Sequence, residues 1–310
     1  MVNPDVIVET FALGKRYGTR WAVRDLQLRV HRGDVFGFLG PNGAGKSTTI
    51  RMLLSLIRPT TGEVRLFGHP LRGDRRRALA SVGGIVEKPD FYAYLSAVRN
   101  LEIVGALYGG VKRSRITEVL ELVGLEDRAS DPVKAYSHGM KQRLGIAQAL
   151  LADPQLVILD EPTGGLDPQG MKEIRELIIH LSRDRGKTIF LSSHLLYEIE
   201  QVATRMAIIN QGTMIAQGRV DEMLSQGQYS VHLQAEPREK AESVLRRLRG
   251  TVKSFERVND EFRVSIDRTE IPRLQTALVG AGVRVYAIVP HRSLEDYFLS
   301  ITEHAGKGTS

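Results

Sequence analysis

Gly40-Pro-Asn-Gly-Ala-Gly-Lys-Ser47 is the most informative motif of this 310-residue chain for its fold class. It matches G-x-x-x-x-G-K-[ST], a loop whose glycines let successive backbone N–H groups turn inward around an anion. An apolar run at residues 34–40 (DVFGFLG) leads into it, and a helix-like stretch at residues 46–57 follows it. A strand, a tight loop and a helix are the order that a phosphate-binding loop requires. The predicted phosphate-binding residues are Gly40, Pro41, Asn42, Gly43, Ala44, Gly45, Lys46, Ser47 and Thr48.

The side chains that close this loop predict a site for a nucleoside triphosphate. The helix that begins here presents unpaired N–H groups and the positive end of its dipole to the same phosphate. Lys46 adds a cation for the β- and γ-phosphates, and Ser47 offers a hydroxyl to Mg²⁺. The chain contains no Asn-Lys-x-Asp motif for reading guanine, which disfavours a GTPase.

Two adjacent carboxylates follow a second apolar run. Asp160 and Glu161 come directly after residues 156–159 (LVIL). Ligands of open parallel sheets bind outside the carboxyl ends of the strands, where the phosphate loop also lies. Asp160 can hold Mg²⁺ through water, and Glu161 can accept a proton from an attacking water molecule. The pair therefore predicts a metal ligand and the general base of a hydrolytic site.

A histidine ends the third apolar run, residues 187–193 (KTIFLSS). His194 would thus lie at the carboxyl end of another strand. A neutral imidazole can form a hydrogen bond with a γ-phosphate and orient its hydrolysis. The predicted catalytic residues are Lys46, Glu161 and His194.

The order of patterns along the chain predicts two domains. Continuous apolar strands that alternate with helices indicate a parallel sheet covered on both faces. Residues from about 90 to 150 read as an inserted helical subdomain. Residues 223–228 are the predicted linker, and residues 229–304 follow the β-α-β-β-α-β order of a small ferredoxin-like α+β domain. The last residues, 305–310, are expected to be a frayed tail.

Composition excludes several classes of protein. Apolar residues make up 42% and charged residues 25% of the chain, which are ordinary globular values. The lack of cysteine removes disulfides, thiol catalysis, cysteine–zinc sites and iron–sulfur clusters. No apolar run approaches the roughly 18–20 residues that span a bilayer, and the first residues lack the features of a secretory signal. We therefore expect a soluble, cytoplasmic chain.

An ordered set of motifs resembles the ATP-binding cassette (ABC) ATPases. Residues 136–143 (YSHGMKQR) are similar to the signature motif of that family. Together with the phosphate loop, Asp160-Glu161, Gly165-Leu166-Asp167 and His194, the resemblance covers about residues 5–222. It implies an α/β P-loop NTPase cassette over residues 1–222, with a parallel-sheet core, a helical subdomain and a small C-terminal α+β domain beyond it.

The resemblance also implies an activity and a partner. In this family two cassettes pair head to tail, and each signature closes ATP against the phosphate loop of the other copy. Ser137 and Gly139 would then donate hydrogen bonds across the interface, and Asp167 would lie in the loop that links the two sites. Tyr17 matches the aromatic residue that stacks on adenine in the family. The implied activity is ATP hydrolysis, with ATP and Mg²⁺ as cofactors.

Two positions depart from the usual pattern of the family. The signature, usually Leu-Ser-Gly-Gly-Gln, here reads Tyr-Ser-His-Gly-Met over residues 136–140. Glu87 replaces a glutamine that contacts Mg²⁺, so the implied metal ligands are Ser47, Glu87 and Asp160. Both departures resemble those of exporter ATPases that protect bacteria from bacitracin-type or lantibiotic peptides. Residues 293–299 (SLEDYFL) resemble the closing motif of ATPases that serve ABC-2 exporters.

The leading hypothesis is an ATP-hydrolysing subunit that forms a homodimer and powers export of a drug, a peptide antibiotic or a lipid-like compound. Because the sequence shows no spanning segment, a separate permease would hold it at the inner face of the cell membrane. The resemblance implies that this permease docks near Glu87 and the helical subdomain. A soluble ABC ATPase acting on nucleic acid or ribosomes stays open, since the net charge is +7. An ATP-dependent clamp with little turnover stays open as well. The leading hypothesis expects no nucleic-acid partner.

Overall fold

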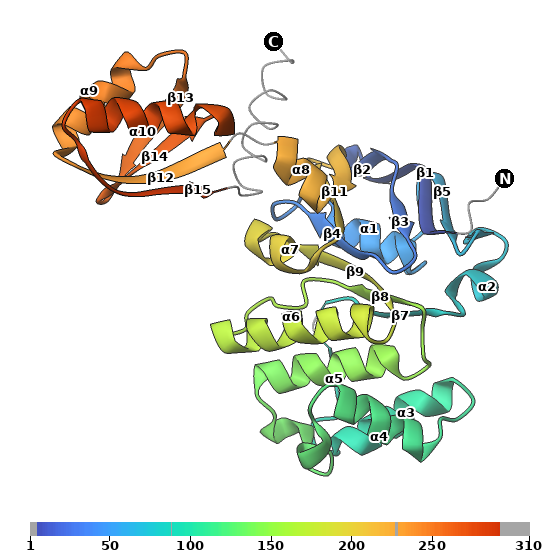
Figure 1. Cartoon of the computed structure of the whole chain (residues 1–310). Coiled ribbons are helices and arrows are strands. Elements are labelled where there is room, and N and C mark those ends of the chain that lie inside the picture. The colour runs from blue at the N-terminus through green and yellow to red at the C-terminus, as the bar shows by residue number, and fades with distance from the viewer. Residues whose placement is uncertain (1–4, 88, 227–228, 292–310) are drawn as a thin grey trace. The chain divides into compact units, whose positions relative to one another are not determined.

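The computed structural model describes residues 5–87, 89–226 and 229–291 (Figure 1). The chain divides into two compact units, residues 1–220 and residues 221–310. Within the described residues, no helix is both long enough and apolar enough to cross a membrane.

A six-stranded sheet forms the centre of the first unit. Its order is β11-β10-β4-β9-β8-β7, in which β10, β4, β9, β8 and β7 are parallel and β11 is an antiparallel edge strand. This confirms the predicted parallel core, and every residue of strands β4, β8 and β9 is buried. The strands are β4 (Val35–Leu39), β7 (Val82–Ile85), β8 (Leu156–Leu159), β9 (Thr188–Ser193), β10 (Arg205–Asn210) and β11 (Thr213–Arg219).

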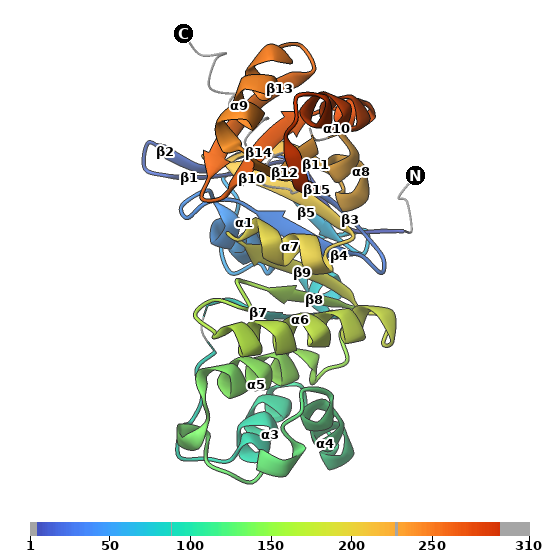
Figure 2. The same ribbon diagram turned by 60° about the vertical axis from the view of Figure 1, so that its left-hand side comes forward.

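Side chains of β4 point alternately to the two faces of the sheet, and both faces are covered. On one face Phe36 and Phe38 pack beside Phe190 of β9, with the rings of Phe36 and Phe190 stacked at 5.5 Å between centroids. On the other face Gly37 leaves room for Ile199 of α7 (Leu196–Val202), since a Cβ there would lie 2.5 Å from the Ile199 side chain. Figure 2 shows α7 and α6 (Pro168–Arg183) on the same side of this sheet.

The helix after the phosphate loop is shorter than the sequence predicts. The sequence predicts a helix over residues 46–57, but α1 spans Lys46–Leu53. Ser55 has a φ of 55°, a left-handed conformation that a helix cannot continue through. Ile50, Met52 and Leu53 of α1 belong to the same apolar core as Phe36 and Phe38.

A second, antiparallel sheet was not predicted from the sequence. Its order is β2-β1-β5-β6, and β3 pairs with β1. The apolar alternation of the long β1 strand is broken by register shifts, and Ala12 within it has a φ of 44°. Its strands are β1 (Val6–Tyr17), β2 (Arg20–Leu26), β3 (Arg29–His31), β5 (Thr61–Leu66) and β6 (His69–Pro70), and the short helix α2 (Arg75–Leu79) follows them.

The predicted helical subdomain is present between β7 and β8. It consists of α3 (Ala97–Leu107), α4 (Arg113–Leu122) and α5 (His138–Leu150), with short 3-10 turns at Glu126–Arg128 and Val133–Ala135. The Ser96 hydroxyl caps α3 by accepting a hydrogen bond from the N–H of Arg99. Figure 1 shows α5 between the sheet and the outer helices α3 and α4.

The second unit follows the order β12-α9-β13-β14-α10-β15. Its four strands form an antiparallel sheet in the order β13-β14-β12-β15, and the helices pack with it around a separate apolar core. The elements are β12 (Tyr229–Glu236), α9 (Arg238–Arg247), β13 (Val252–Val258), β14 (Glu261–Ile266), a 3-10 turn at Arg268–Glu270, α10 (Ile271–Gly280) and β15 (Arg284–His291).

The start of the predicted linker is helical instead. Helix α8 spans Val220–Gln226 and so takes in residues 223–226. Val220 and Met223 are buried. Asp221 and Glu222 lie in the first turn, where their negative charges stabilise the helix by interacting with the positive end of its dipole. The motif at residues 293–299 and the expected tail at 305–310 lie outside the described residues.

Candidate nucleotide-binding site

The phosphate loop occupies the six residues between β4 and α1, as its sequence predicts. Gly43 and Gly45 have φ values of 79° and 110°, which side chains larger than hydrogen rarely adopt. A Cβ on Gly45 would also lie 2.5 Å from the carbonyl oxygen of Ala22. The second and third glycines of the motif are therefore required by the backbone path itself.

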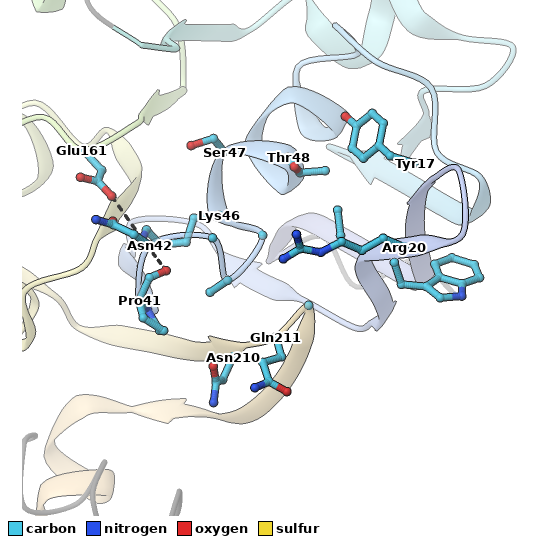
Figure 3. Close-up of a pocket in the computed structure, with 16 residues that line it drawn as sticks. Tyr17, Arg20, Pro41, Asn42, Lys46, Ser47, Thr48, Glu161, Asn210 and Gln211 are labelled. Carbon is cyan, nitrogen blue, oxygen red and sulfur yellow. Dashed lines mark hydrogen bonds and ion pairs between the residues drawn. The ribbon is translucent and has the colours of Figure 1, made fainter.

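A pocket of about 890 Å³ opens around this loop. Figure 3 shows Glu161 on one side of the loop, with Tyr17 and Arg20 from the β1–β2 hairpin on the other and the β10–β11 turn below it. Tyr17 is half exposed, and the Lys15 ammonium lies 5.3 Å from its ring centre. The lining residues are Tyr17, Arg20, Trp21, Ala22, Pro41, Asn42, Gly43, Ala44, Gly45, Lys46, Ser47, Thr48, Glu161, Asn210, Gln211 and Gly212.

Lys46 is buried within the loop, and its ammonium is fully engaged there. It donates hydrogen bonds to the carbonyl oxygens of Gly40 at 2.6 Å and Pro41 at 3.3 Å. Its Nζ also lies 3.2 Å from Oε1 of Glu161. Lys46 thus joins the phosphate loop to the end of β8 (Figure 3).

The carboxylate of Glu161 lies between the other two predicted catalytic side chains, those of Lys46 and His194. Oε1 contacts Lys46, and Oε2 lies 2.9 Å from Nδ1 of His194. The backbone of Glu161 has a φ of 47°, and its N–H donates to the Ser192 hydroxyl at 2.9 Å. Three strand ends, those of β4, β8 and β9, therefore bring Lys46, Glu161 and His194 together.

Asp160 is more enclosed than its neighbour. Its side chain is buried, and Oδ1 accepts a hydrogen bond of 2.6 Å from the Ser192 hydroxyl. Ser192 therefore contacts both carboxylate residues, through the side chain of Asp160 and the backbone of Glu161. A serine at this position orients the pair, which sequence reasoning did not identify.

A second pocket, of about 450 Å³, meets the first at Ser47 and Glu161. All three predicted metal ligands, Ser47, Glu87 and Asp160, line it. No group of three or more histidine, cysteine, aspartate or glutamate side chains suited to a metal occurs in the described part of the chain. Mg²⁺ does not need such a cage, because it binds through one or two carboxylates, water and substrate phosphates. The lining residues are Ser47, Glu87, His138, Gln142, Asp160, Glu161, Gly164, Gly165 and His194.

Glu87 has a charged partner that the sequence did not indicate. Its carboxylate forms an ion pair with the Arg51 guanidinium from α1. The residue has a φ of 67°, so the backbone turns sharply where β7 has ended. Arg51 therefore offsets the extra negative charge that Glu87 adds beside the phosphate loop.

Ser137 of the signature and Asp167 beyond it serve as helix caps within their own copy of the chain. The Ser137 hydroxyl accepts from the N–H of Met140 at the start of α5, and Asp167 accepts from the N–H of Gly170 at the start of α6. His138 Nε2 lies 3.2 Å from the carbonyl oxygen of Gly164. Neither of the two pockets has Ser137, Gly139 or Asp167 among its lining residues.

Sequence reasoning missed several residues of the first pocket. Arg20, Asn210 and Gln211 line it from turns of the β1–β2 and β10–β11 hairpins. No motif marks them, and Arg20 is one of 43 basic residues in the chain. Their place follows only from the antiparallel pairings, which the sequence patterns did not predict.

The chain is similar in sequence to transport ATPases along most of its length. The family model described as "ABC transporter" matches residues 23–164. The bacitracin transport ATP-binding protein BcrA of Bacillus licheniformis is 43% identical over 297 residues, which are 95% of this chain and 97% of that protein. The lantibiotic transport ATP-binding protein SrtF of Streptococcus pyogenes is 43% identical over 67% of this chain and 89% of its own length.

Solved structures show the same similarity at the level of the fold. The structure of an ATP-binding subunit of an ABC transporter superposes with a TM-score of 0.63 at 30% identity, covering 71% of this chain and 92% of that one. A dimeric post-hydrolysis state of the cassette MJ0796, bound to ADP and phosphate, gives a TM-score of 0.62 at 25% identity, covering 69% of this chain and 99% of that one.

Proposed function

This chain belongs to the ABC transporter ATP-binding family, since it is 43% identical to BcrA over 95% of its length, and we propose which of its residues hydrolyse ATP and what the energy is used for. The chain is an ATPase that works with a membrane permease. The observation that carries the proposed site is the meeting of Lys46, Glu161 and His194 at the edge of the phosphate-loop pocket.

ATP would bind with its phosphates in the glycine loop and its base toward Tyr17. The loop N–H groups and the start of α1 provide donors for the phosphates. Lys46, now bonded to backbone carbonyls, has a stronger acceptor in a phosphate oxygen because both partners are then charged. Tyr17 and Arg20 lie on the side of the loop away from Glu161, which leaves the γ-phosphate end for the catalytic residues (Figure 3).

The site also suits Mg²⁺. Ser47 and Asp160 supply hard oxygen ligands in one pocket, and Glu87 lines the same pocket. When bound there, Mg²⁺ neutralises phosphate charge. The ion pair between Glu87 and Arg51 reduces the repulsion between this carboxylate and the triphosphate.

Glu161 is the proposed general base. Lys46 and His194 hold its carboxylate from both sides at the edge of the pocket, where it can accept a proton from water directed at the γ-phosphate. His194, whose Nδ1 contacts Glu161, would fix the carboxylate and present its other ring nitrogen to phosphate. The product is ADP with inorganic phosphate.

A second copy would complete each site. Ser137, Gly139 and Asp167 do not line the phosphate-loop pocket of their own chain, so contacts with ATP need another molecule. The dimeric MJ0796 cassette supports pairing of this kind. A head-to-tail pair would bury two ATP molecules between unlike surfaces.

We further propose that the permease exports a peptide antibiotic. The bacitracin and lantibiotic transport proteins, both 43% identical, support this substrate class. The permease would hold the chain at the inner face of the cell membrane.

The test uses a susceptible host that expresses this chain with its permease. Cells with the wild-type chain should survive higher bacitracin or lantibiotic concentrations than cells with Lys46→Ala. Equal susceptibility of the two strains to both peptide classes would contradict the proposed substrate class. Phosphate release by the purified protein then distinguishes two failures. Normal release means that only the proposed transport substrate is wrong, whereas no release means that the proposed ATPase activity is wrong.

A further inference from the structure

Two consecutive buried serines end β9, and they point to opposite faces of the sheet. Ser192 contacts Asp160 and Glu161, as described above. Ser193 faces the other way, and its hydroxyl donates a hydrogen bond of 2.7 Å to Oε2 of Glu198 on α7. Glu198 is five residues further along the chain, and the proposed function gives it no role.

Glu198 is buried at a cost in stability. Its residue is only 5% exposed, and its Oε1 is buried without a hydrogen-bond partner among the residues that the structure describes. A buried carboxyl oxygen without a partner lowers the free energy of unfolding, and an apolar side chain of similar size would avoid that penalty. Stability therefore does not explain why a glutamate lies here.

The Ser193 hydroxyl also holds the backbone on the far side of His194. It accepts a hydrogen bond of 3.0 Å from the N–H of Leu195. A hydroxyl can donate only one hydrogen bond. Because the Ser193 hydroxyl donates its bond to Glu198, its oxygen lone pairs stay directed at the N–H of Leu195. Without Glu198, the proton would turn toward the Leu195 carbonyl oxygen, which lies 3.4 Å from the Ser193 hydroxyl.

His194 is the residue between these two fixed points. Ser193 precedes it at the end of the sheet, and Leu195 follows it at the start of α7. The His194 ring leaves this short turn to place Nδ1 2.9 Å from Glu161. A shift of the turn by a fraction of that distance would break the contact.

We infer that Glu198 is a positioning residue for hydrolysis: through Ser193 it fixes the turn that places His194 against Glu161. The inference rests on the proposed roles of Glu161 and His194. Glu198 touches neither ATP nor the reacting atoms, so it acts only through geometry.

The test replaces the carboxyl group in two ways and measures steady-state hydrolysis. Glu198→Gln keeps an oxygen that accepts from Ser193, so kcat should stay close to that of the wild type. Glu198→Leu fills the space without an acceptor, and kcat should fall about 10-fold because a small misplacement is costly. The Kd for ATP should stay within about twofold, since no contact with the phosphate loop changes.

Three further variants separate positioning from a general loss of structure. Ser193→Ala removes the same hydrogen bond and should lower kcat as Glu198→Leu does, and the double variant should be no worse. In a His194→Ala background, Glu198→Leu should have no further effect. Gln201→Leu on the exposed side of the same helix is the matched control and should leave hydrolysis unchanged.

The outcomes distinguish the inference from the proposed function. Wild-type kcat for Glu198→Leu, or an equal loss with and without His194, would overturn the inference. If His194→Ala itself hydrolyses ATP normally, the proposed role of His194 fails and the inference fails with it. Should Glu198→Leu not fold, Ser193→Ala carries the same test, with thermal unfolding as the check of its structure.

Discussion

Two regions differ in how complete they are within one chain. The strand-end region consists of Lys46, Glu161 and His194, and the signature region consists of residues 136–143 with Asp167. Lys46, Glu161 and His194 lie just beyond the ends of three strands, and Glu161 already contacts both of the others beside a pocket. Ser137 and Asp167 cap helices and line neither pocket. Under the proposed function, the first region would be half of a hydrolytic site, and the second would be a surface that contacts the nucleotide of another copy.

The largest expected effect comes from the strand-end region. Glu161→Gln removes the proposed base but keeps the size of the side chain, so hydrolysis should fall by about 10²–10⁴-fold with ATP binding intact. Phosphate release and ATP titration measure the two quantities. Near-normal turnover would remove Glu161 from its role.

A change in the signature region should be nearly as severe without disturbing the fold. A Cβ on Gly139 would have no neighbour closer than 4.0 Å, so Gly139→Asp fits its own chain. In a pair of cassettes it would place a negative charge toward the ATP of the partner, and hydrolysis should fall by about 10²-fold. Gly139→Ala is the matched control without charge. If Gly139→Asp hydrolyses ATP like the control, the signature does not face nucleotide.

A smaller effect is expected where the two regions meet, at the second pocket. Glu87→Gln removes the ion pair with Arg51, which is partly exposed and contributes at most about 1 kcal/mol to folding. Hydrolysis or its coupling to transport should change by a few-fold, while thermal unfolding stays the same within that limit. Arg51→Gln tests the other half of the pair. Identical hydrolysis and transport in wild type and Glu87→Gln would show that the departure at this position has no consequence.

The smallest effect is expected away from both regions. Asp153 accepts a hydrogen bond from Lys187, which holds the pKa of its carboxyl below its ordinary value. Its contribution to stability is therefore present at neutral pH and is lost as the pH falls through the lowered pKa. Asp153→Asn should unfold slightly more easily than wild type at pH 7 and equally at strongly acidic pH, with unchanged ATP hydrolysis. A difference that grows on acidification would contradict this assignment.

The strand-end region was predictable because its patterns are local. The apolar runs at residues 34–40, 156–159 and 187–193 lead directly into the phosphate loop, Asp160-Glu161 and His194, and parallel strands align those ends. The structure places strands at nearly the same bounds. Contacts such as Ser192 with Asp160 and Arg51 with Glu87 depend on side-chain directions that no motif encodes.

The rest of the site was beyond such patterns. Tyr17 was assigned from resemblance alone, and Arg20 was not assigned, because the bulged β1–β2 hairpin gives no clear alternation. No function can be inferred from the residue types of the signature region alone, because the ATP that it is expected to contact binds to another copy of the chain.

Mixing two inactive variants tests most directly whether each site is shared between copies. Glu161→Gln and Gly139→Asp should each be nearly inactive alone. Random pairing would give heterodimers in half of the pairs, each with one site of wild-type residues, so the mixture should recover about one quarter of the wild-type activity. If the mixture stays as inactive as its components although the variants pair, each copy uses its own signature and the shared site is wrong.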